Sequence, residues 1–186
     1  MSYFLTGGTG FIGRNLIDQL LKRRGNIYVL VRSSSKAKFK ALSEGWGASA
    51  KRVIPVTGDL SRPFLGVSAA KRKELKGEIR HVFHLGAVYD LKADDKDQQE
   101  ANVDGTKHAV QFAEAVEAKR FHHVSSIAAA GLYQGVFRED MFEVATGLEH
   151  PYFRTKHESE GIVRHQCSVP WRIYRPGIVV GHSKTG

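Results

Sequence analysis

Six short apolar segments recur along the chain, and stretches with the spacing of an amphipathic helix separate them. The pattern predicts strands at residues 3–6, 27–31, 52–56, 81–85, 121–125 and 171–174. It predicts helices at 11–21, 37–46, 68–76, 98–118 and 151–165. Strands that alternate with helices pair in parallel, because each connection crosses back over the sheet. We therefore expect a Rossmann-type α/β fold, a doubly wound parallel sheet with helices on both faces and strand order 3-2-1-4-5-6.

A glycine-rich turn joins the first expected strand to the first expected helix. Its sequence is Thr6-Gly7-Gly8-Thr9-Gly10-Phe11-Ile12-Gly13. Gly8, Gly10 and Gly13 have the spacing of a dinucleotide-binding turn, and Gly7 with the last two fits a wider form of it. The N–H groups at a helix N-terminus bind phosphate, and glycine lets the backbone approach it closely. A turn that merely connects two elements is the alternative, but the strand–turn–helix context favours a dinucleotide site.

The residues after the second and third expected strands indicate which dinucleotide binds. An NAD site usually has a carboxylate about 20 residues after the glycines, where it binds the ribose 2′-hydroxyl. Here the position holds Arg32 and Ser33, which both donate hydrogen bonds to phosphate oxygens. They favour the 2′-phosphate of NADPH, although a solvated arginine at a strand end is the alternative. Gly58-Asp59-Leu60 follows the third strand and is either an adenine contact or a simple turn.

Polar residues near the expected carboxyl edge of the sheet are candidates for catalysis. Tyr152 and Lys156 are four residues apart, so they share one face of a helix. A lysine near a tyrosine favours the phenolate and lowers the pKa of the phenol, which makes it a usable acid at neutral pH. Ser125-Ser126 ends the preceding strand, where a hydroxyl can hold a carbonyl oxygen as charge develops on it. The tyrosine–lysine spacing alone is a weak signal, and its place along the chain strengthens it.

Length, composition and charge fit a single globular domain. The chain has 186 residues, of which 41% are hydrophobic and 25% charged. Its one cysteine, Cys167, cannot form an internal disulfide, which fits a reducing, cytoplasmic compartment. We expect no secretory leader, because a strand begins at Tyr3, and no apolar run reaches the roughly 20 residues of a membrane span. The net charge of +9 lies in short scattered runs, which argues against nucleic acid and for a polyanionic cofactor or substrate.

Other polar and aromatic clusters are interpreted as structural. Two histidine pairs lie on expected strands, His81 with His84 and His122 with His123. In each pair the two rings point to opposite faces of the sheet, so we expect no metal site. Tyr89 and Tyr133 lie near the carboxyl edge, where they either line a substrate slot or pack in the core.

Taken together, the motifs resemble the extended short-chain dehydrogenase/reductase superfamily, and they span the whole chain. They are Thr6-Gly7-x-x-Gly10-x-x-Gly13, Gly58-Asp59-Leu60, Asn102-Val103-x-Gly105-Thr106, Ser125-Ser126, Tyr152-x-x-x-Lys156 and Arg175-Pro176-Gly177. The resemblance implies that Ser126, Tyr152 and Lys156 are the catalytic residues. It implies a cofactor site formed by Gly7, Gly10, Phe11, Ile12, Gly13, Arg32, Ser33, Asp59, Leu60, Leu85, Gly86, Ala87, Asn102, Tyr152, Lys156, Pro176 and Val179. Gly86 departs from the superfamily, which usually has alanine there, so we expect looser packing at that edge of the cofactor.

Three stretches, 122–133, 137–142 and 174–183, resemble bacterial fatty acyl-CoA reductases. This resemblance implies NADPH-dependent reduction of a fatty acyl thioester, an acyl-CoA, to aldehyde and, with a second hydride, to alcohol. It also implies that residues 1–186 are the amino-terminal NADP-binding part of a larger protein, with the substrate-binding part largely outside them. The alternatives are a sugar-nucleotide epimerase or hydroxysteroid-type dehydrogenase of the same superfamily, or an NADP-binding redox sensor without catalysis. Such sensors tend to lack the tyrosine–lysine pair.

Overall fold

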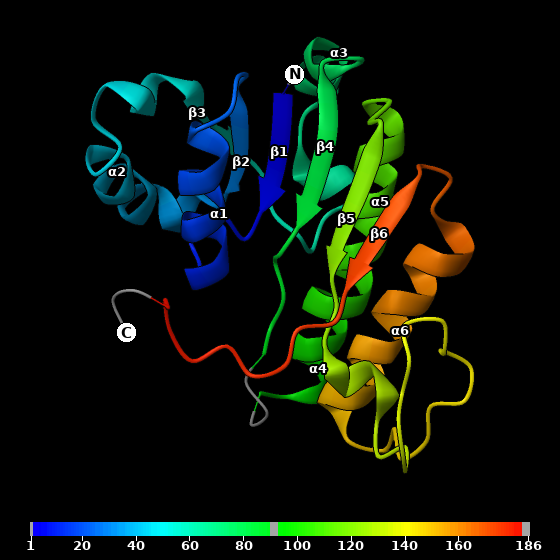
Figure 1. The fold of residues 1–186 in the computed structure, drawn as a ribbon. Coiled ribbons are helices and arrows are strands. Elements are labelled where there is room, and N and C mark those ends of the chain that lie inside the picture. Colours follow the sequence, from blue (N-terminus) through cyan, green and yellow to red (C-terminus); the bar gives the residue numbers. More distant parts are fainter. Residues whose placement is uncertain (1, 90–92, 184–186) are drawn as a thin grey trace.

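The computed structural model describes residues 2–89 and 93–183, and it contains all six expected strands. These are β1 (Ser2–Thr6), β2 (Ile27–Val31), β3 (Val53–Thr57), β4 (Ile79–His84), β5 (Arg120–Val124) and β6 (Trp171–Tyr174). They form one parallel sheet in the order β3-β2-β1-β4-β5-β6 (Figure 1). The predicted fold and strand order are confirmed, and each strand lies within two residues of its predicted bounds.

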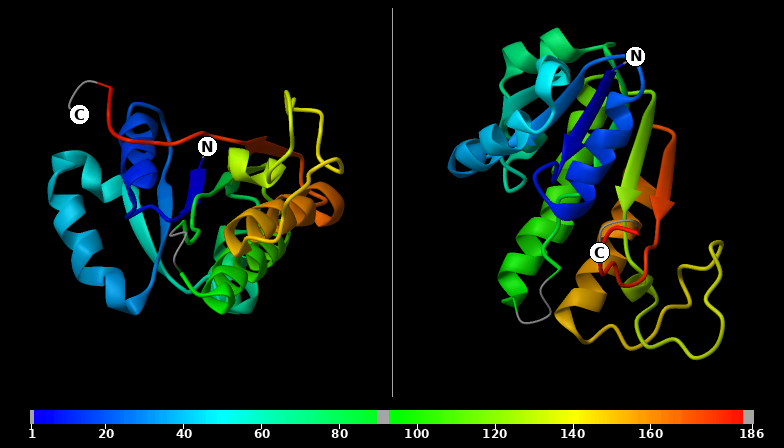
Figure 2. Two further views of the ribbon diagram at one scale, coloured as in Figure 1. Left: turned by 90° about the horizontal axis from the view of Figure 1, so that it is seen from below. Right: turned by 60° about the vertical axis from the view of Figure 1, so that its left-hand side comes forward.

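Helices cover both faces of the sheet. They are α1 (Phe11–Leu21), α2 (Lys36–Glu44), α3 (Ala69–Leu75), α4 (Asp95–Gln98), α5 (Gly105–Ala115) and α6 (Pro151–Gln166). Shorter turns are η1 (Ser33–Ser35), η2 (Gly47–Arg52), η3 (Pro63–Gly66), the π-helical η4 (Gln99–Asp104) and η5 (Ile127–Ala130). Figure 2 shows α1 on one side of the sheet and α5 and α6 on the other.

The two faces of the sheet have separate hydrophobic cores, because successive strand residues point to opposite sides. On one face Leu5 of β1 packs with Ile17 of α1 and Phe39 of α2. On the other face Phe4 packs with Phe112 of α5, and their ring centroids are 4.2 Å apart. One strand thus holds helices on both of its sides, which fixes the position of the turn that follows it.

The single regular helix predicted at 98–118 is wrong in its bounds and its regularity. Helical structure begins earlier, at Asp95 in α4, passes through the π-helical η4, and ends at Ala115 in α5. Beyond α5 the chain turns sharply, since Glu117 has a φ of +54°. A π-helical turn holds an extra residue and is often found at functional sites. Here that turn contains Asn102, one of the expected cofactor residues.

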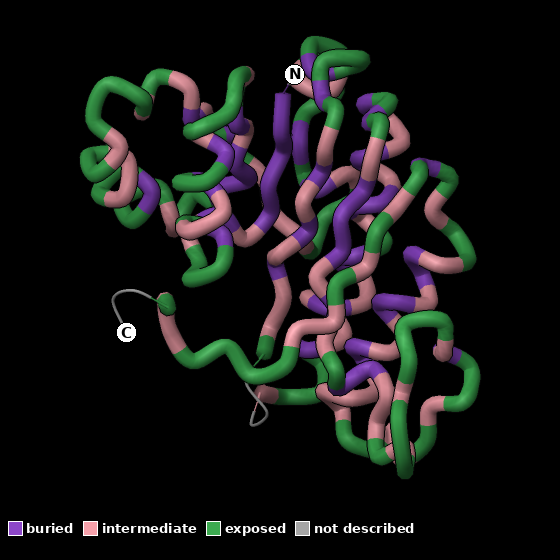
Figure 3. Tube along the Cα trace, viewed as in Figure 1, coloured by how far each residue is buried: buried purple, intermediate pink, exposed green. Residues whose placement is uncertain are grey.

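The carboxyl ends of all six strands meet at one edge, the lower edge in Figure 1. Figure 3 shows that the strands are largely buried and that the segments beyond this edge are largely exposed. Residues 175–183 leave β6 and run along the edge toward α1. A groove of about 430 Å³ lies between them, lined by Phe11, Ile12, Asn15, Leu16, Gln19, Gly181, His182 and Ser183. No helix within residues 2–89 and 93–183 has both the length and the apolar character to cross a membrane.

Candidate active site

The glycine turn after β1 forms a close-packed loop at the start of α1. Gly7 has a φ of +68°, a conformation that favours glycine. A Cβ on Gly13 would lie 2.3 Å from the Gly7 carbonyl oxygen and 2.6 Å from the Cα of Gly8, so only glycine fits there. Gly10 is the N-cap of α1, and no side chain in the described part of the protein caps this helix. Its first N–H groups are therefore free for an anion.

This loop meets the requirements of a dinucleotide pyrophosphate. The backbone is stripped of side chains where a ligand must approach closely, and the helix amides that follow point outward from the sheet edge. The expected cofactor residues Gly7, Gly10, Phe11, Ile12 and Gly13 lie together in this loop. The residues present therefore fit this part of an NAD(P) cofactor.

A buried histidine fixes the loop to the neighbouring strand. Thr106 Oγ1 donates to the Asn102 carbonyl (2.6 Å), so it accepts from His84 Nε2 (3.0 Å), and His84 Nδ1 accepts from Thr6 Oγ1 (2.8 Å). The Thr6 oxygen in turn accepts from the N–H groups of Leu85 (3.1 Å) and residue 86 (3.0 Å). Burial, with a smaller contribution from the Lys156 charge, lowers the pKa of His84 to about 3. The neutral ring thus aligns the end of β1 with the end of β4.

The adenine side of the expected site lies at the ends of β2 and β3. Arg32 follows β2, is exposed, and makes no ion pair within the described residues, while Ser33 begins η1. Asp59 is half-buried, and its Oδ1 accepts from the N–H (3.0 Å) and the Oγ (2.9 Å) of Ser61. The structure thus brings an unpaired guanidinium to the sheet edge where a 2′-phosphate is expected. The Asp59 carboxylate thus accepts hydrogen bonds within its own turn.

The expectation of looser packing at Gly86 is wrong. Gly86 is buried, and a Cβ there would lie only 2.7 Å from Leu60 Cδ1. The Leu60 side chain therefore fills the space that an alanine methyl would take. Leu85 and Ala87 flank this position and are half-buried, so the three residues form a closed wall after β4.

Asn102 acts on the protein's own backbone. Its Oδ1 accepts from Val88 N–H (2.8 Å), and its Nδ2 donates to the Val88 carbonyl (3.0 Å) and to Thr155 Oγ1 (3.1 Å). Both amide hydrogens are used in these contacts. Asn102 thus ties the segment after β4 to α6, one residue before Lys156.

Ser126 lies at the end of β5 as the N-cap of η5. Its Oγ accepts from Ala128 N–H (3.1 Å), which leaves the hydroxyl hydrogen free to donate elsewhere. The backbone around it is held on the β6 side, since Ser125 N–H donates to the Tyr174 carbonyl (2.8 Å) and Ile127 N–H to the Pro176 carbonyl (3.1 Å). The half-buried Ser126 hydroxyl is therefore set on a firmly anchored turn.

Tyr152 and Lys156 lie on consecutive turns of α6. Pro151 occupies the first helical turn, where its missing N–H has no cost, and Tyr152 follows it, half-buried. Lys156 is buried, and its Nζ donates to the Val124 carbonyl at the end of β5 (3.0 Å). Burial lowers the pKa of Lys156 to about 8, although the Glu160 charge raises it. The ammonium is thus bound to the end of β5, two residues before Ser126, and lies on the helical turn after that of Tyr152.

The last expected cofactor residues, Pro176 and Val179, lie in the segment after β6. Pro176 is half-buried, and its carbonyl accepts a hydrogen bond from the N–H of Ile127 at the start of η5. Val179 is 49% exposed. Tyr89 is 83% exposed, so it is no part of the core, and Tyr133 is half-buried with its ring centroid 5.4 Å from that of Phe137. These aromatic residues border the edge without closing it.

The histidine pairs alternate across the sheet. His81 Nδ1 lies 3.0 Å from His122 Nε2 on one face, while His84 and His123 stack on the other with centroids 5.6 Å apart. Burial, with the nearby His81 and arginine charges, lowers the pKa of His122 to about 4. In the part of the chain that the structure describes, no group of three or more histidine, cysteine or acidic side chains is arranged to hold a metal ion.

Sequence reasoning assigned no role to a buried ion-pair network beneath the site. Glu160 is fully buried on α6, and its carboxylate accepts from Ser125, Arg164 and Arg175. Two signals pointed to it: a carboxylate one helical turn after Lys156, and the arginine of the Arg175-Pro176-Gly177 motif. Neither shows from the sequence alone that the two side chains meet.

The fold and this arrangement define an NAD(P)-binding Rossmann domain of the short-chain dehydrogenase/reductase type. The sequence profile of the family described as "Male sterility protein", an NAD-binding family, matches residues 5–186. The chain belongs to this family. The predicted resemblance to fatty acyl-CoA reductases is confirmed, because the relatives include a named fatty acyl-CoA reductase and a terminal R domain from a PKS-NRPS pathway.

Three relatives illustrate the family. A linear gramicidin synthase of Brevibacillus parabrevis is 36% identical over 198 residues, which cover 98% of this chain and 4% of that protein. Fatty acyl-CoA reductase wat of Drosophila melanogaster is 30% identical over 219 residues, covering 95% of this chain and 42% of that one. The crystal structure of the terminal R domain from the myxalamid PKS-NRPS biosynthetic pathway is 33% identical, with a TM-score of 0.85 over 99% of this chain. The present chain covers 51% of that structure and far less of the synthase.

Proposed function

We propose that this chain is the cofactor-binding and proton-donating part of an NADPH-dependent reductase of fatty acyl thioesters, with acyl-CoA as the substrate. The observation that carries the proposal is the buried Lys156 ammonium, which donates to the Val124 carbonyl at the end of β5 and belongs to a residue one helical turn after Tyr152, at the sheet edge that also carries the glycine loop. The names of the relatives support the substrate class, since one is a fatty acyl-CoA reductase and another is a terminal R domain.

The cofactor-binding residues form two groups along the sheet edge, and each group would contact a different part of the dinucleotide. The glycine loop would hold the pyrophosphate, and Arg32 with Ser33 would hold the 2′-phosphate of NADPH. Asp59 and Leu60 would border the adenine, and Leu85 to Ala87 with Pro176 and Val179 would border the nicotinamide half. When bound, the reduced nicotinamide supplies the hydride that adds to the thioester carbonyl carbon.

The side chains of this protein manage the charge and the proton. As the carbonyl oxygen gains negative charge, the free Ser126 hydroxyl hydrogen donates to it, and Tyr152 transfers its phenolic proton to it. The Lys156 ammonium stabilises the phenolate that remains and would also bind the nicotinamide ribose. The product is a hemithioacetal; its carbon–sulfur bond then breaks, its hydroxyl proton moves to sulfur, and an aldehyde and a free thiol result.

Product analysis tests this function. Palmitoyl-CoA and NADPH are incubated with the whole protein, including any part outside residues 1–186. NADPH oxidation, free CoA thiol and long-chain aldehyde are measured together. We expect thiol to appear with NADPH loss, in equal amounts if the aldehyde is released. NADPH binding without thiol release would contradict the proposal and favour the redox sensor.

Residues 1–186 alone should bind NADPH but reduce palmitoyl-CoA poorly. The cofactor loop and the Ser126, Tyr152 and Lys156 set lie within them, whereas we place most of the substrate-binding part outside them. Full turnover by residues 1–186 would show that the substrate site is complete here and would contradict that division.

A further inference from the structure

The Glu160 carboxylate is the centre of a buried polar network. Its Oε2 accepts from Ser125 Oγ (2.8 Å) and Arg175 Nε (3.0 Å), and its Oε1 accepts from Arg175 Nη2 (2.5 Å) and Arg164 Nε (2.8 Å). The Glu160 side chain is fully buried, and 13% of the Arg175 side chain is exposed. Burial alone would raise the pKa of Glu160, but hydrogen bonds from Arg175, Ser125 and Arg164 outweigh it and hold the pKa below its ordinary value.

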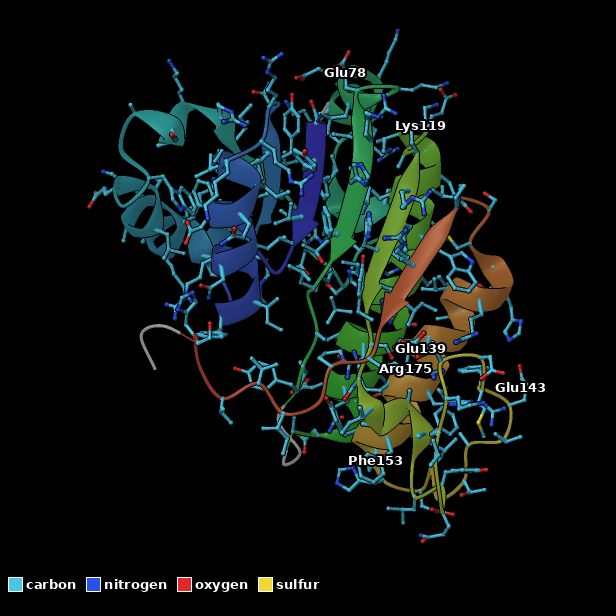
Figure 4. The ribbon with its side chains drawn as sticks, in the orientation of Figure 1. Glu78, Lys119, Glu139, Glu143, Phe153 and Arg175 are labelled. Atoms are coloured by element: carbon cyan, nitrogen blue, oxygen red, sulfur yellow. The ribbon has the colours of Figure 1, made fainter. Side chains whose placement is uncertain are left out.

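Arg175 extends this network to a loop. The loop, residues 131–150, joins η5 to α6 and is called here the η5–α6 loop. Arg175 Nη2 donates to the Met141 carbonyl (2.7 Å) and Nη1 to the Arg138 carbonyl (3.1 Å), and the guanidinium lies 4.9 Å from the centre of the Phe137 ring. Figure 4 shows Arg175 at the lower end of β6, beside this loop.

The pair contacts segments that lead to the residues of the proposed reaction site. Ser125, which Glu160 binds, precedes Ser126, and Glu160 itself is one helical turn from Lys156. The η5–α6 loop, which Arg175 binds, connects the turn of Ser126 to the helix that begins just before Tyr152. One ion pair therefore joins the end of β5, the end of β6, α6 and the loop.

We propose, resting on the function proposed above, that the Glu160–Arg175 pair is a positioning device for catalysis. It holds the Ser126 turn, the Lys156 ammonium and the η5–α6 loop in one fixed arrangement. The bidentate contact fixes the orientation of both groups, which a single hydrogen bond would not. Neither residue touches the reacting atoms in this scheme, so both act through Ser126, Tyr152 and Lys156. A displacement of these groups by about 1 Å is enough to cost about 100-fold in rate.

The pKa of Lys156 separates a positioning role from a purely structural one, because the two roles predict shifts in opposite directions when the pair is lost. Burial lowers the pKa of Lys156, and Glu160 on its own helix raises it; burial and then the Lys156 charge lower the pKa of His84 on β4 and of His123 on β5, so both rings are neutral. If Glu160 is held near Lys156 as described, Glu160→Gln lowers the pKa of Lys156 further. If the pair only supports packing, its loss loosens the core, admits water and raises the pKa of Lys156 toward the ordinary value of a lysine.

The experiment compares Glu160→Gln, Glu160→Asp and Arg175→Lys with the unchanged protein. Glu158→Gln is the matched control, because Glu158 lies on the same helix but pairs on the surface with Arg154. The pKa of Lys156 is measured by NMR of carbon-labelled lysine, and kcat for palmitoyl-CoA and Kd for NADPH are measured across pH. We expect kcat to fall about 10- to 100-fold in Glu160→Gln, with a smaller change in Kd, and we expect partial recovery in Glu160→Asp.

Arg175→Lys keeps both charges and tests the loop contact even if Glu160→Gln does not fold. We expect lower kcat, an unchanged pKa of Lys156, and faster hydrogen exchange at residues 137–143. Three results would each overturn the proposal. The first is that Glu160→Gln behaves like Glu158→Gln, and the second is that the pKa of Lys156 rises in Glu160→Gln. The third is that Arg175→Lys has normal kcat and normal hydrogen exchange. If the unchanged protein does not reduce acyl-CoA, the function proposed above fails, while the NMR and exchange measurements still decide whether the pair positions Lys156 and the loop.

Discussion

The two halves of the sheet build their parts of the site in different ways. In the half that contains β1 and β2, the chemistry comes from consecutive residues, Gly7 to Gly13, and from backbone N–H groups. In the half that contains β5 and β6, the proposed chemistry depends on side chains far apart in the chain, Ser126, Tyr152 and Lys156, and on the Glu160–Arg175 pair that we propose positions them. The first half needs a local backbone conformation, and the second needs several elements to pack correctly.

The difference shows where each half is sensitive to change. At its glycine positions the loop has no side chain to misplace, and an added Cβ at Gly7 or Gly13 would meet neighbouring backbone atoms. The half that contains β5 and β6, together with β4, holds a lysine, three histidines and a carboxylate in buried positions, and the charged lysine and carboxylate both have hydrogen-bond partners there. Substitutions in the two halves should therefore separate cofactor binding from chemistry.

The largest effect is expected for Tyr152→Phe in the catalytic half. The phenolic proton is needed only as the oxyanion forms, so kcat should fall about 10²- to 10⁴-fold while NADPH affinity is nearly unchanged. Lys156→Ala should reduce both, because the ammonium acts on the ribose as well as on the tyrosine. The measurement is NADPH consumption with palmitoyl-CoA. A Tyr152→Phe variant that keeps more than about a tenth of the rate would exclude Tyr152 as the acid.

Acid should destabilise the protein through the histidines of β4 and β5. The folded-state pKa is about 3 for His84 and about 4 for His122, chiefly because of burial. Between pH about 6.5 and about 4 the unfolded chain binds more protons than the folded chain, so the free energy of unfolding falls as the pH falls. Each histidine contributes about 1.4 kcal/mol per pH unit in that window. Urea unfolding measures the slope; His122→Gln should reduce it, and a flat profile would contradict the burial of these rings.

In the glycine half, Gly13→Ala should damage both folding and cofactor binding. The added methyl would lie against the carbonyl of Gly7 and the Cα of Gly8, neither of which can move freely. We expect a loss of about 1–3 kcal/mol in the free energy of unfolding and much weaker NADPH binding. Gly45→Ala, at a helix end with ordinary space around it, is the control. Equal behaviour of the two variants would refute the close approach at Gly13.

The smallest effect is expected for Arg32→Ala, which should change cofactor choice alone. The exposed guanidinium pairs only with the 2′-phosphate in the proposed site, so the preference for NADPH over NADH should fall roughly tenfold, or about 1.4 kcal/mol. Calorimetric titration with both cofactors measures the ratio of their Kd values. An unchanged ratio would remove Arg32 from the site and leave the choice of dinucleotide to other residues.

Residues whose roles depend on local pattern could be predicted well. The strand bounds, the glycine loop and the shared helix face of Tyr152 and Lys156 follow from periodicity, glycine spacing and helix geometry. The regular helix predicted at 98–118 was wrong, because local periodicity carries no information about contacts with residues distant in the chain. Its π-helical turn contains Asn102, which binds Val88 and Thr155, residues distant from it in the chain.

The sequence by itself determined the doubly wound sheet, its strand order and the edge at which chemistry gathers, because these depend on patterns that repeat within a few residues. Only the tertiary structure decided that Leu60 fills the space beside Gly86, that Lys156 is buried against β5, and that Glu160 meets Arg175. Those outcomes depend on side chains from separate elements, and the energy of a buried charge depends on which partners packing brings to it. Local pattern thus predicted the fold, whereas packing determined the electrostatics of the site.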